Sequence, residues 1–267
     1  MMDTARLFAF GLFTGALLVG TPTAIFAQTP AEHAEHETLS YNVEVVEKLL
    51  EKADPDVAFL ARIHMMQGHL NAAIYAVGKG DLVEARQHII HPVSEIMPDI
   101  VRVLKERNLE DPTPILNNIV RLLETGKKDQ IEAAMYDAIV PISDLQYSIE
   151  TSKMVLDRII ADTVVLLLRT AVMEYNEAFK EDKITSIVEY HDGSAFVTEA
   201  ATLILDFKYE WATRNPEAFS QLDHSLKELQ TAWPSEVPPS DAVIPLTRML
   251  SLVTVIDEQI GQIRAGS

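Results

Sequence analysis

The strongest constraint on the fold is a short pattern that would end one helix and start the next, and it occurs twice. The pattern G-K-x-D-x-x-E-A covers residues 78–85 and returns 48 residues later over residues 126–133. Glycine favours the left-handed conformation that closes a helix, and an aspartate with a glutamate three residues on is typical of a helix start. Each copy therefore predicts a tight turn between two helices, and the repeat predicts one helical hairpin per unit.

Helical spacing of apolar residues dominates the chain from Tyr41 onward, and no segment shows the alternation expected of a strand. In the first unit, Asp54-Pro55 begins a helix over 55–77, and a return helix runs to about residue 108, bent by its two prolines. The sequence thus predicts an all-α fold of antiparallel helical hairpin repeats that form one or two helix bundles.

Two further hairpins follow the repeat. A long helix over 149–179 meets a polar turn over 180–183 and a return helix to about Trp211, and a last hairpin runs from Asn215 to Arg264. We therefore expect an N-terminal hairpin bundle over 41–148 and a C-terminal helical bundle over 149–267.

The N-terminus has the features of an export signal. Leu7–Gly20 is an apolar run of the length of a signal-peptide core, and Ala27 is a small residue at a suitable cleavage position. The run is shorter than the ~20 residues that a spanning helix needs. We therefore expect a signal peptide over 1–27, a flexible acidic and histidine-bearing linker over 28–40, and a periplasmic or secreted protein with no membrane span after cleavage.

Composition excludes several classes of function. The net charge of −18 repels phosphate backbones, which argues against nucleic acid as a partner. The absence of cysteine excludes disulfides, thiolate metal sites and cysteine nucleophiles. No nucleophile elbow, phosphate loop or H-E-x-x-H motif is present, so the sequence does not predict an enzyme.

Histidines are concentrated on the first hairpin. In an antiparallel pair, positions equally far from the turn lie side by side, so a turn near residue 80 places His64 opposite Glu95. The same symmetry places His69 between His88 and His91. The predicted metal ligands on this hairpin are His64, Met65, His69, His88, His91 and Glu95.

Facing helices that direct such ligands inward are the usual form of a metal site in a helix bundle. Imidazole with carboxylate favours iron or zinc, whereas an added thioether favours copper(I), and iron or copper is the expected ion. A second, carboxylate-rich site is expected from Glu174, Glu189 and His191, which approach one another across the turn at 180–183.

Three other interpretations remain open from the residues alone. The histidines and Glu95 could satisfy one another as a buried polar network without an ion. Histidine and methionine could instead be axial ligands of a b-type haem. The hairpin repeats could also form a protein-binding scaffold.

One segment carries a resemblance to known proteins. The stretch from Leu166-Leu-Leu-Arg-Thr-Ala-Val-Met-Glu-Tyr175 through Glu189-Tyr-His-Asp-Gly-Ser-Ala-Phe-Val197 resembles a helical hairpin of periplasmic iron-uptake proteins, namely the extracytoplasmic domains of iron permeases and the imelysin group. The shared pattern is a long helix, a short acidic turn, then Glu-Tyr and an aromatic six residues on, and it covers about 30 residues.

The resemblance implies an exported helical bundle that handles a transition metal for uptake, storage or delivery. It also implies a membrane transporter or another protein as a partner. The imelysin signature G-x-H-x-x-E is matched only at Gly68-His69, without its glutamate, and the permease signature REGLE is absent. Only His69 is therefore carried over as a signature residue.

Overall fold

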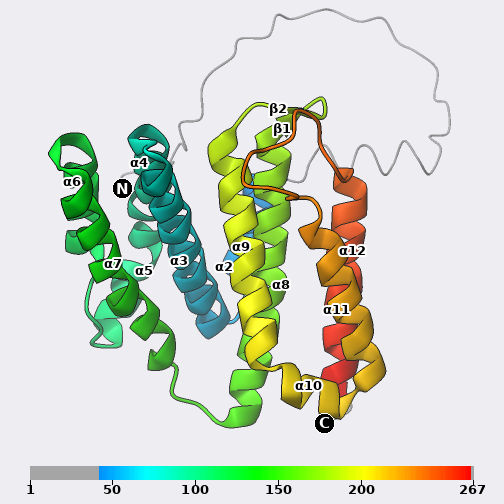
Figure 1. The fold of residues 1–267 in the computed structure, drawn as a ribbon. Coiled ribbons are helices and arrows are strands. Elements are labelled where there is room, and N and C mark those ends of the chain that lie inside the picture. Colours follow the sequence, from blue (N-terminus) through cyan, green and yellow to red (C-terminus); the bar gives the residue numbers. More distant parts are fainter. Residues whose placement is uncertain (1–41, 266–267) are drawn as a thin grey trace, which may run out of the picture.

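The computed structural model describes residues 42–265 of the 267-residue chain. The predicted signal peptide and the whole of the predicted linker, including His33 and His36, lie outside these residues. The predicted all-α architecture is confirmed (Figure 1). The α-helices are α2 (Val43–Lys52), α3 (Pro55–Lys79), α4 (Leu82–His91), α5 (Met97–Glu106), α6 (Thr113–Thr125), α7 (Lys128–Asp144), α8 (Lys153–Ala178), α9 (Ile187–Asp206), α10 (Lys208–Arg214), α11 (Pro216–Gln230) and α12 (Leu246–Ala265).

The helices stand side by side as antiparallel pairs. Figure 1 shows α6 and α7 at one side, α3 and α4 next to them, then α8 with α9, and α11 with α12 at the other side. The short helix α2 packs on α8, and α3 packs on both α8 and α9. One continuous apolar core includes buried residues of all these pairs. The first hairpin therefore lies directly against α9, which is far from it in sequence.

The first predicted turn is confirmed in detail. Gly80 closes α3 with φ of 86°, the left-handed conformation that glycine adopts without strain. The Asp81 carboxylate then accepts the backbone N–H of Glu84 at 2.9 Å and caps α4. These caps fix where α4 begins, and so they fix the positions of its histidines relative to α3.

The second copy of the pattern folds differently. Gly126 is extended, with φ of −82°, and α7 begins at Lys128. The cap is made by Gln130, whose side-chain oxygen accepts the backbone N–H of Lys127 at 3.1 Å. The prediction from the repeat that Asp129 caps this helix, as Asp81 caps α4, was therefore wrong, because α7 begins two residues earlier and Asp129 lies inside its first turn.

A π-helical turn, η1 (Pro92–Ile96), joins α4 to α5. Proline has no N–H to donate within the helix, and here the N–H of Met97 bonds to the carbonyl of Pro92, five residues earlier. The Ser94 hydroxyl donates to the carbonyl of Ile90 at 2.9 Å. The predicted bend near Pro92 therefore takes the form of one wide turn, directly after His91.

The third hairpin differs from its prediction at both ends. Residues 149–152 are not helical: a 3-10 turn, η2 (Leu145–Ser148), precedes them, and Ser152 caps α8. The polar turn contains two short antiparallel strands, β1 (Phe179–Lys180) and β2 (Lys183–Ile184). The return helix ends at Asp206, before the separate short helix α10.

Helices α8 and α9 approach closely at Gly193. A Cβ atom added there would lie 2.9 Å from Cζ2 of Trp233 and 3.1 Å from the carbonyl oxygen of Ala171. No larger residue fits without moving α9, and the neighbouring Asp192 is consequently placed deep between helices. Among the described helices, none is both long and apolar enough to cross a membrane.

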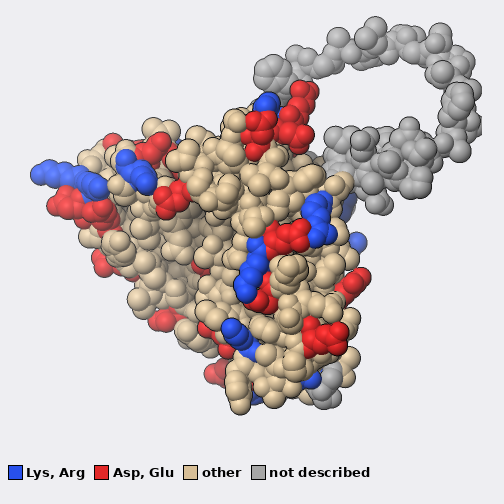
Figure 2. Space-filling view, turned by 45° about the vertical axis from the view of Figure 1, so that its right-hand side comes forward, with Lys and Arg blue, Asp and Glu red and all other residues tan. Residues whose placement is uncertain are grey.

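The face shown in Figure 2 carries charged side chains of both signs. On the surface shown there, Lys and Arg side chains lie among Asp and Glu side chains. Several charged side chains of the described residues form ion pairs, such as Arg248 with Glu228 at 2.6 Å. The interior of the molecule holds a separate set of buried polar residues, among them His69, His88 and Asp192.

Candidate metal centre

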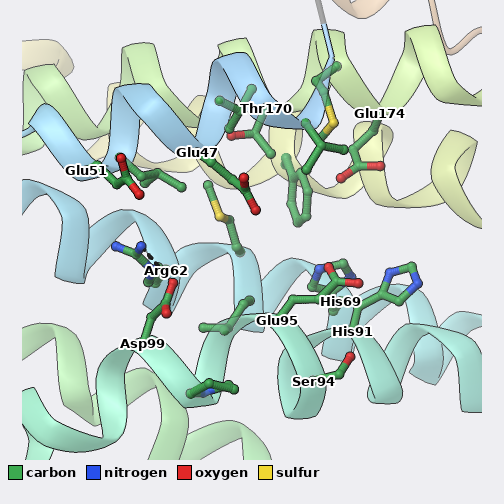
Figure 3. Close-up of a pocket in the computed structure, with 18 of the residues that line it drawn as sticks. Glu47, Glu51, Arg62, His69, His91, Ser94, Glu95, Asp99, Thr170 and Glu174 are labelled. Carbon is green, nitrogen blue, oxygen red and sulfur yellow. Dashed lines mark hydrogen bonds and ion pairs between the residues drawn. The ribbon is translucent and has the colours of Figure 1, made fainter. Parts of the chain in front are cut away.

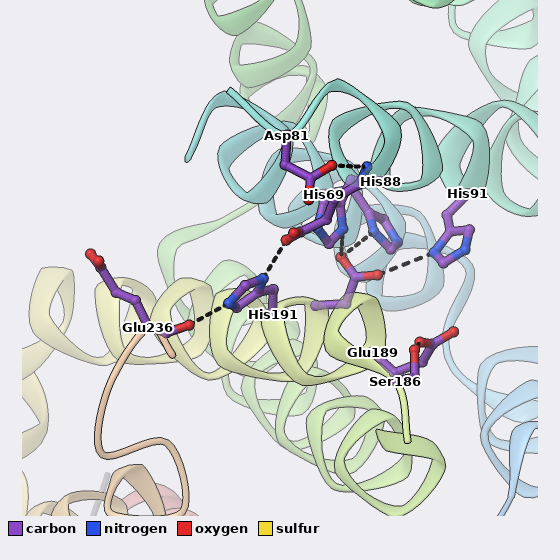
Figure 4. Close-up of polar contacts among 10 residues, drawn as sticks. His69, Asp81, His88, His91, Ser186, Glu189, His191 and Glu236 are labelled. Atoms are coloured by element: carbon purple, nitrogen blue, oxygen red, sulfur yellow. Dashed lines mark hydrogen bonds and ion pairs between the residues drawn. The ribbon is translucent and has the colours of Figure 1, made fainter. Parts of the chain in front are cut away.

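Three imidazoles meet one fully buried carboxylate, that of Asp192 on α9. Nδ1 of His69 and Nδ1 of His88 each lie 2.8 Å from Oδ1 of Asp192, and Nδ1 of His91 lies 3.1 Å from Oδ2 (Figure 4). A carboxylate oxygen accepts, so each Nδ1 carries the proton and donates it. The bonds to Asp192 therefore fix the orientation of all three rings.

The imidazoles differ in charge although they share this partner. Burial lowers the pKa of His69, so this ring is neutral. Burial also opposes the charge on His88, but Asp192 and Glu84 outweigh it and raise the pKa of His88 to about 9. The same balance, with Asp192 as the main favourable partner, raises the pKa of His91.

Asp192 itself stays ionised. Burial alone would raise its pKa, but the interactions with His69 and His88 hold the pKa well below its usual range. One negative charge is thus enclosed by three rings that can lose or gain a proton.

A second polar chain leads away from His88 on the other side. Nε2 of His88 lies 3.5 Å from Oε1 of Glu84, and Nδ1 of His191 lies 2.5 Å from the same oxygen. Nε2 of His191 donates to the backbone carbonyl of Glu236 at 2.7 Å, as Figure 4 shows. Both ring nitrogens of His88 therefore have a polar partner, and so do both ring nitrogens of His191.

His69 and His91 border a cavity of about 940 Å³ between α2, α3, α8 and the α4–η1–α5 segment. Their rings are in edge contact, with centroids 5.2 Å apart. Within the described part of the chain, Nε2 of both rings carries no hydrogen bond. The cavity also has acidic walls: Figure 3 shows the carboxylates that line it, which belong to Glu47, Glu51, Glu95, Asp99 and Glu174.

Two of these carboxylates lie near the imidazoles and resist ionisation. Burial, followed by the charges of Asp192 and Glu189, raises the pKa of Glu174 well above its usual value. Burial also raises the pKa of Glu95, although the charge of His91 opposes this. Burial is the main cause of both shifts, and the neighbouring carboxylates add to it.

The structure brings most of the predicted first site together. His69, His88 and His91 all contact Asp192, while Met65 and Glu95 line the same cavity as His69 and His91. His64 does not join them. Its Nδ1 lies 2.9 Å from Glu199, and its Nε2 is buried without a partner.

The predicted pairing of His64 with Glu95 was therefore wrong. Five residues separate His64 from His69, which rotates one side chain by about 140° from the other around a helix. His64 consequently meets Glu199 on α9, whereas Met65, four residues before His69, shares its face.

The predicted second site divides between two places. Glu174 lines the cavity beside the first group, and the charge of Glu189 acts on Glu174, Glu95 and His91. The Glu189 carboxylate also accepts the Ser186 hydroxyl. His191 points the other way, to Glu84. Glu189 and His191, two residues apart on α9, thus lie on different sides of the centre.

Sequence reasoning missed Asp192, the residue at the middle of the site. A usable signal was present, because Val188, Asp192 and Phe196 follow at intervals of four and all three are buried. An aspartate within an apolar helical stripe requires a buried partner. The partners could not be named because they lie more than 100 residues away in sequence.

The geometry offers two groups that could hold an ion. Donor atoms of His69, His91 and Asp192 lie within 4.8 Å of one another, and so do those of Glu84, His88 and His191. Imidazole and carboxylate together suit divalent first-row transition metals. No haem or other cofactor is needed to explain the hydrogen bonds of either group.

Comparison with known proteins gives one family match, which lies in the C-terminal half of the chain. Residues 157–265 match the family described as the iron permease-associated 4-helix bundle domain. This match covers nearly all of α8 together with α9 to α12, and it includes Asp192 and the segment 166–197 on which the resemblance rested. It supports the iron-permease part of that resemblance and does not bear on the imelysin part.

Comparison with curated proteins and with solved structures gave no match. The family match spans less than half of the chain, and α3 and α4 lie outside it. The chain therefore carries an iron permease-related helical bundle, against which a preceding hairpin places three histidines.

Proposed function

We propose that this chain is an exported protein that binds iron in the acidic cavity and supplies it to a membrane transporter for uptake. His69 and His91 are the imidazole ligands of this cavity site, and Glu95 and Glu174 supply carboxylate oxygens. Iron is the substrate of the protein in this proposal.

One observation carries the proposal: a single buried carboxylate orients two imidazoles at the wall of an acidic cavity. Because the Nδ1–H groups of His69 and His91 donate to Asp192, Nε2 of each ring is the nitrogen left to bind an ion, in His91 after the loss of its Nε2 proton. A hydrogen bond from the second ring nitrogen to a carboxylate is the usual support of a histidine ligand.

The charge balance of the cavity favours a cation. Glu95 and Glu174 have raised pKa values because they are buried and lie near other carboxylates, and a bound cation would replace their protons. A mixed set of imidazole and carboxylate ligands suits iron. The family match to an iron permease-associated domain supports iron over copper.

The same charges argue against haem in this cavity. A haem carries propionate groups, and the described lining offers them one arginine, Arg62, which is already paired with Asp99 at 3.0 Å. The absorption spectrum of the purified protein decides the matter, because a bound b-type haem would give a Soret band.

The direct test measures iron bound per chain. Full-length protein is made metal-free and loaded with Fe²⁺ without oxygen, and unbound ion is removed before iron is counted. We expect that the double variant His69→Ala/His91→Ala loses this bound iron. His224→Ala is the matched control, since His224 is exposed on α11 and lies outside both groups.

The carboxylates give a second test of the same site. Glu95→Gln keeps the size of the side chain and removes its charge, so we expect weaker iron binding with an unchanged fold by circular dichroism. Unaltered iron binding in both the histidine and the Glu95 variants would contradict the cavity site.

Export and delivery are tested in cells. We expect the mature chain in the extracytoplasmic fraction, without residues 1–27, and impaired growth on limiting iron when the gene is deleted. Complementation by the wild-type gene but not by the double histidine variant would link growth to the site.

A further inference from the structure

We propose that Glu84, His88 and His191 form a second metal site, for a divalent first-row transition ion such as Fe²⁺ or Zn²⁺. This site is distinct from the cavity site of His69 and His91, and it does not depend on iron being bound there.

The first argument is convergence on one oxygen. Nε2 of His88 and Nδ1 of His191 come from different helices, α4 and α9, and both approach Oε1 of Glu84, at 3.5 Å and 2.5 Å. Two imidazole nitrogens and a carboxylate oxygen are the donors of the 2-His-1-carboxylate sites that bind iron(II), and zinc accepts the same set.

The second argument is the outer hydrogen bond of each ring. Nδ1 of His88 donates to Asp192 at 2.8 Å, and Nε2 of His191 donates to the backbone carbonyl of Glu236 at 2.7 Å. In each ring the nitrogen remote from Glu84 is therefore bound by an acceptor, and the other nitrogen is directed at Glu84. Metal-binding histidines in proteins show this arrangement almost without exception.

A simple polar network does not require this pairing. A histidine that only satisfies a buried carboxylate needs one bond, as His64 shows with Glu199, where the second nitrogen has no partner. His88 and His191 instead have both nitrogens in fixed directions, and an ion among the three groups would replace the protons between them and Glu84. Those protons would pass to the solvent.

Rigid elements hold the three donors. Glu84 and His88 are four residues apart on α4, so they lie on one helix face, and the Asp81 cap fixes Glu84 at the first turn. The side chains of His88, His191 and Glu84 are 0%, 11% and 15% exposed. Such a site needs little rearrangement before it binds an ion.

One of the three donors borders a separate cavity. His191 lines a second cavity of about 350 Å³, whose other walls include Tyr75, Trp233 and Glu236. None of its lining residues lines the larger cavity. The two proposed ions would therefore reach opposite sides of Asp192 by different routes.

Three protein donors leave coordination positions open for water or a small ligand. Asp192 connects the two sites, since it supports His88 for one and His69 with His91 for the other.

The experiment counts Co²⁺, an air-stable probe for such donor sets, on metal-free full-length protein. We expect two ions per wild-type chain. Glu84→Gln and His191→Gln should each remove one ion and leave the other, and His69→Ala/His91→Ala should remove the complementary ion. The visible spectrum of the ion that remains in each variant should match one of the two components of the wild-type spectrum.

The control is Glu124→Gln, which removes a surface carboxylate that pairs with Arg86 of α4 at 2.9 Å. It should keep both ions. Circular dichroism and thermal melting show whether each variant is folded, and the conservative Glu84→Gln change keeps the test usable if His191→Gln unfolds.

The outcomes separate the two proposals. One ion per wild-type chain, lost in His69→Ala/His91→Ala and kept in Glu84→Gln and His191→Gln, would overturn the second site and keep the cavity site. One ion lost only in Glu84→Gln and His191→Gln would support the second site and overturn the cavity site. A chain that binds no Co²⁺ would overturn both.

Discussion

Two buried aspartates of this molecule, Asp157 on α8 and Asp192 on α9, look alike in burial and differ in their partners. Asp157 accepts Nε1–H of Trp211 at 2.8 Å and two N–H groups of Arg214 at 2.7 Å and 3.2 Å. Asp192 accepts three imidazole N–H groups. Both carboxylates are therefore fully hydrogen-bonded.

The difference lies in what the donors can do next. Arginine and tryptophan cannot give up a proton under ordinary conditions, and neither offers a lone pair to an ion. Each imidazole has a second nitrogen that can accept a proton or bind a metal. A buried carboxylate alone thus does not indicate a site, but the chemistry of its partners does.

The largest effect should come from removing each carboxylate. Asp192→Asn leaves the His88 charge buried without its main partner, and we expect a loss of about 3 to 5 kcal/mol in the free energy of unfolding. Asp157→Asn should cost less, about 2 to 3 kcal/mol, because Arg214 is partly exposed and water can replace the lost bond. Urea unfolding of the metal-free proteins measures both. If both variants lost the same small amount of unfolding free energy, the proposed difference between Asp192 and Asp157 would be contradicted.

The next largest effect concerns pH. The folded pKa of His88, about 9, exceeds the ordinary value of 6.5, so the folded protein binds more protons than the unfolded chain between these values. Stability from this group is complete below 6.5 and is lost as pH rises through about 9. The shift corresponds to about 3 kcal/mol.

Thermal or urea unfolding of metal-free protein at the two ends of this range would show the loss. Asp157→Asn should keep the same pH dependence, while His88→Gln should reduce it. A stability that rises with pH across this range would contradict the assignment of a charged His88.

A smaller effect is expected on metal affinity. Asp192 supports the ligands without being required as one, and loss of such an outer partner typically weakens metal binding about 10- to 100-fold. We expect this for Asp192→Asn and no change for Asp157→Asn, both measured by titration with Co²⁺. Equal weakening in the two variants would indicate that general destabilisation, not ligand support, is responsible.

The smallest effect should come from replacing His64, which forms a buried pair with Glu199. The His64→Gln variant keeps a donor for Glu199. It also removes Nε2 of His64, which is buried without a partner in the wild-type protein. We expect a change within about 1 kcal/mol in the free energy of unfolding. Metal binding should not change, and a lost ion would show that His64 belongs to a site after all.

These comparisons also show how far sequence reasoning reaches. The helical fold and the turn at Gly80 follow from local chemistry, namely apolar periodicity and helix capping, and both are confirmed. The convergence of His69, His88 and His91 follows from hairpin symmetry. Asp192 does not follow from either, because it comes from a later hairpin and meets them only through packing of α3 on α9.

The π-helical turn after His91 has a consequence for comparing this chain with relatives. A wide turn of this kind is what one inserted residue leaves behind in a continuous helix, and each residue of an ordinary helix contributes about 100° of rotation. Because the wide turn takes up this extra residue locally, a relative with one residue fewer here would keep the same face of α5 toward the core. Alignments should therefore place a gap inside residues 92–96, and not in the loop at Gly80, where the cap fixes the length.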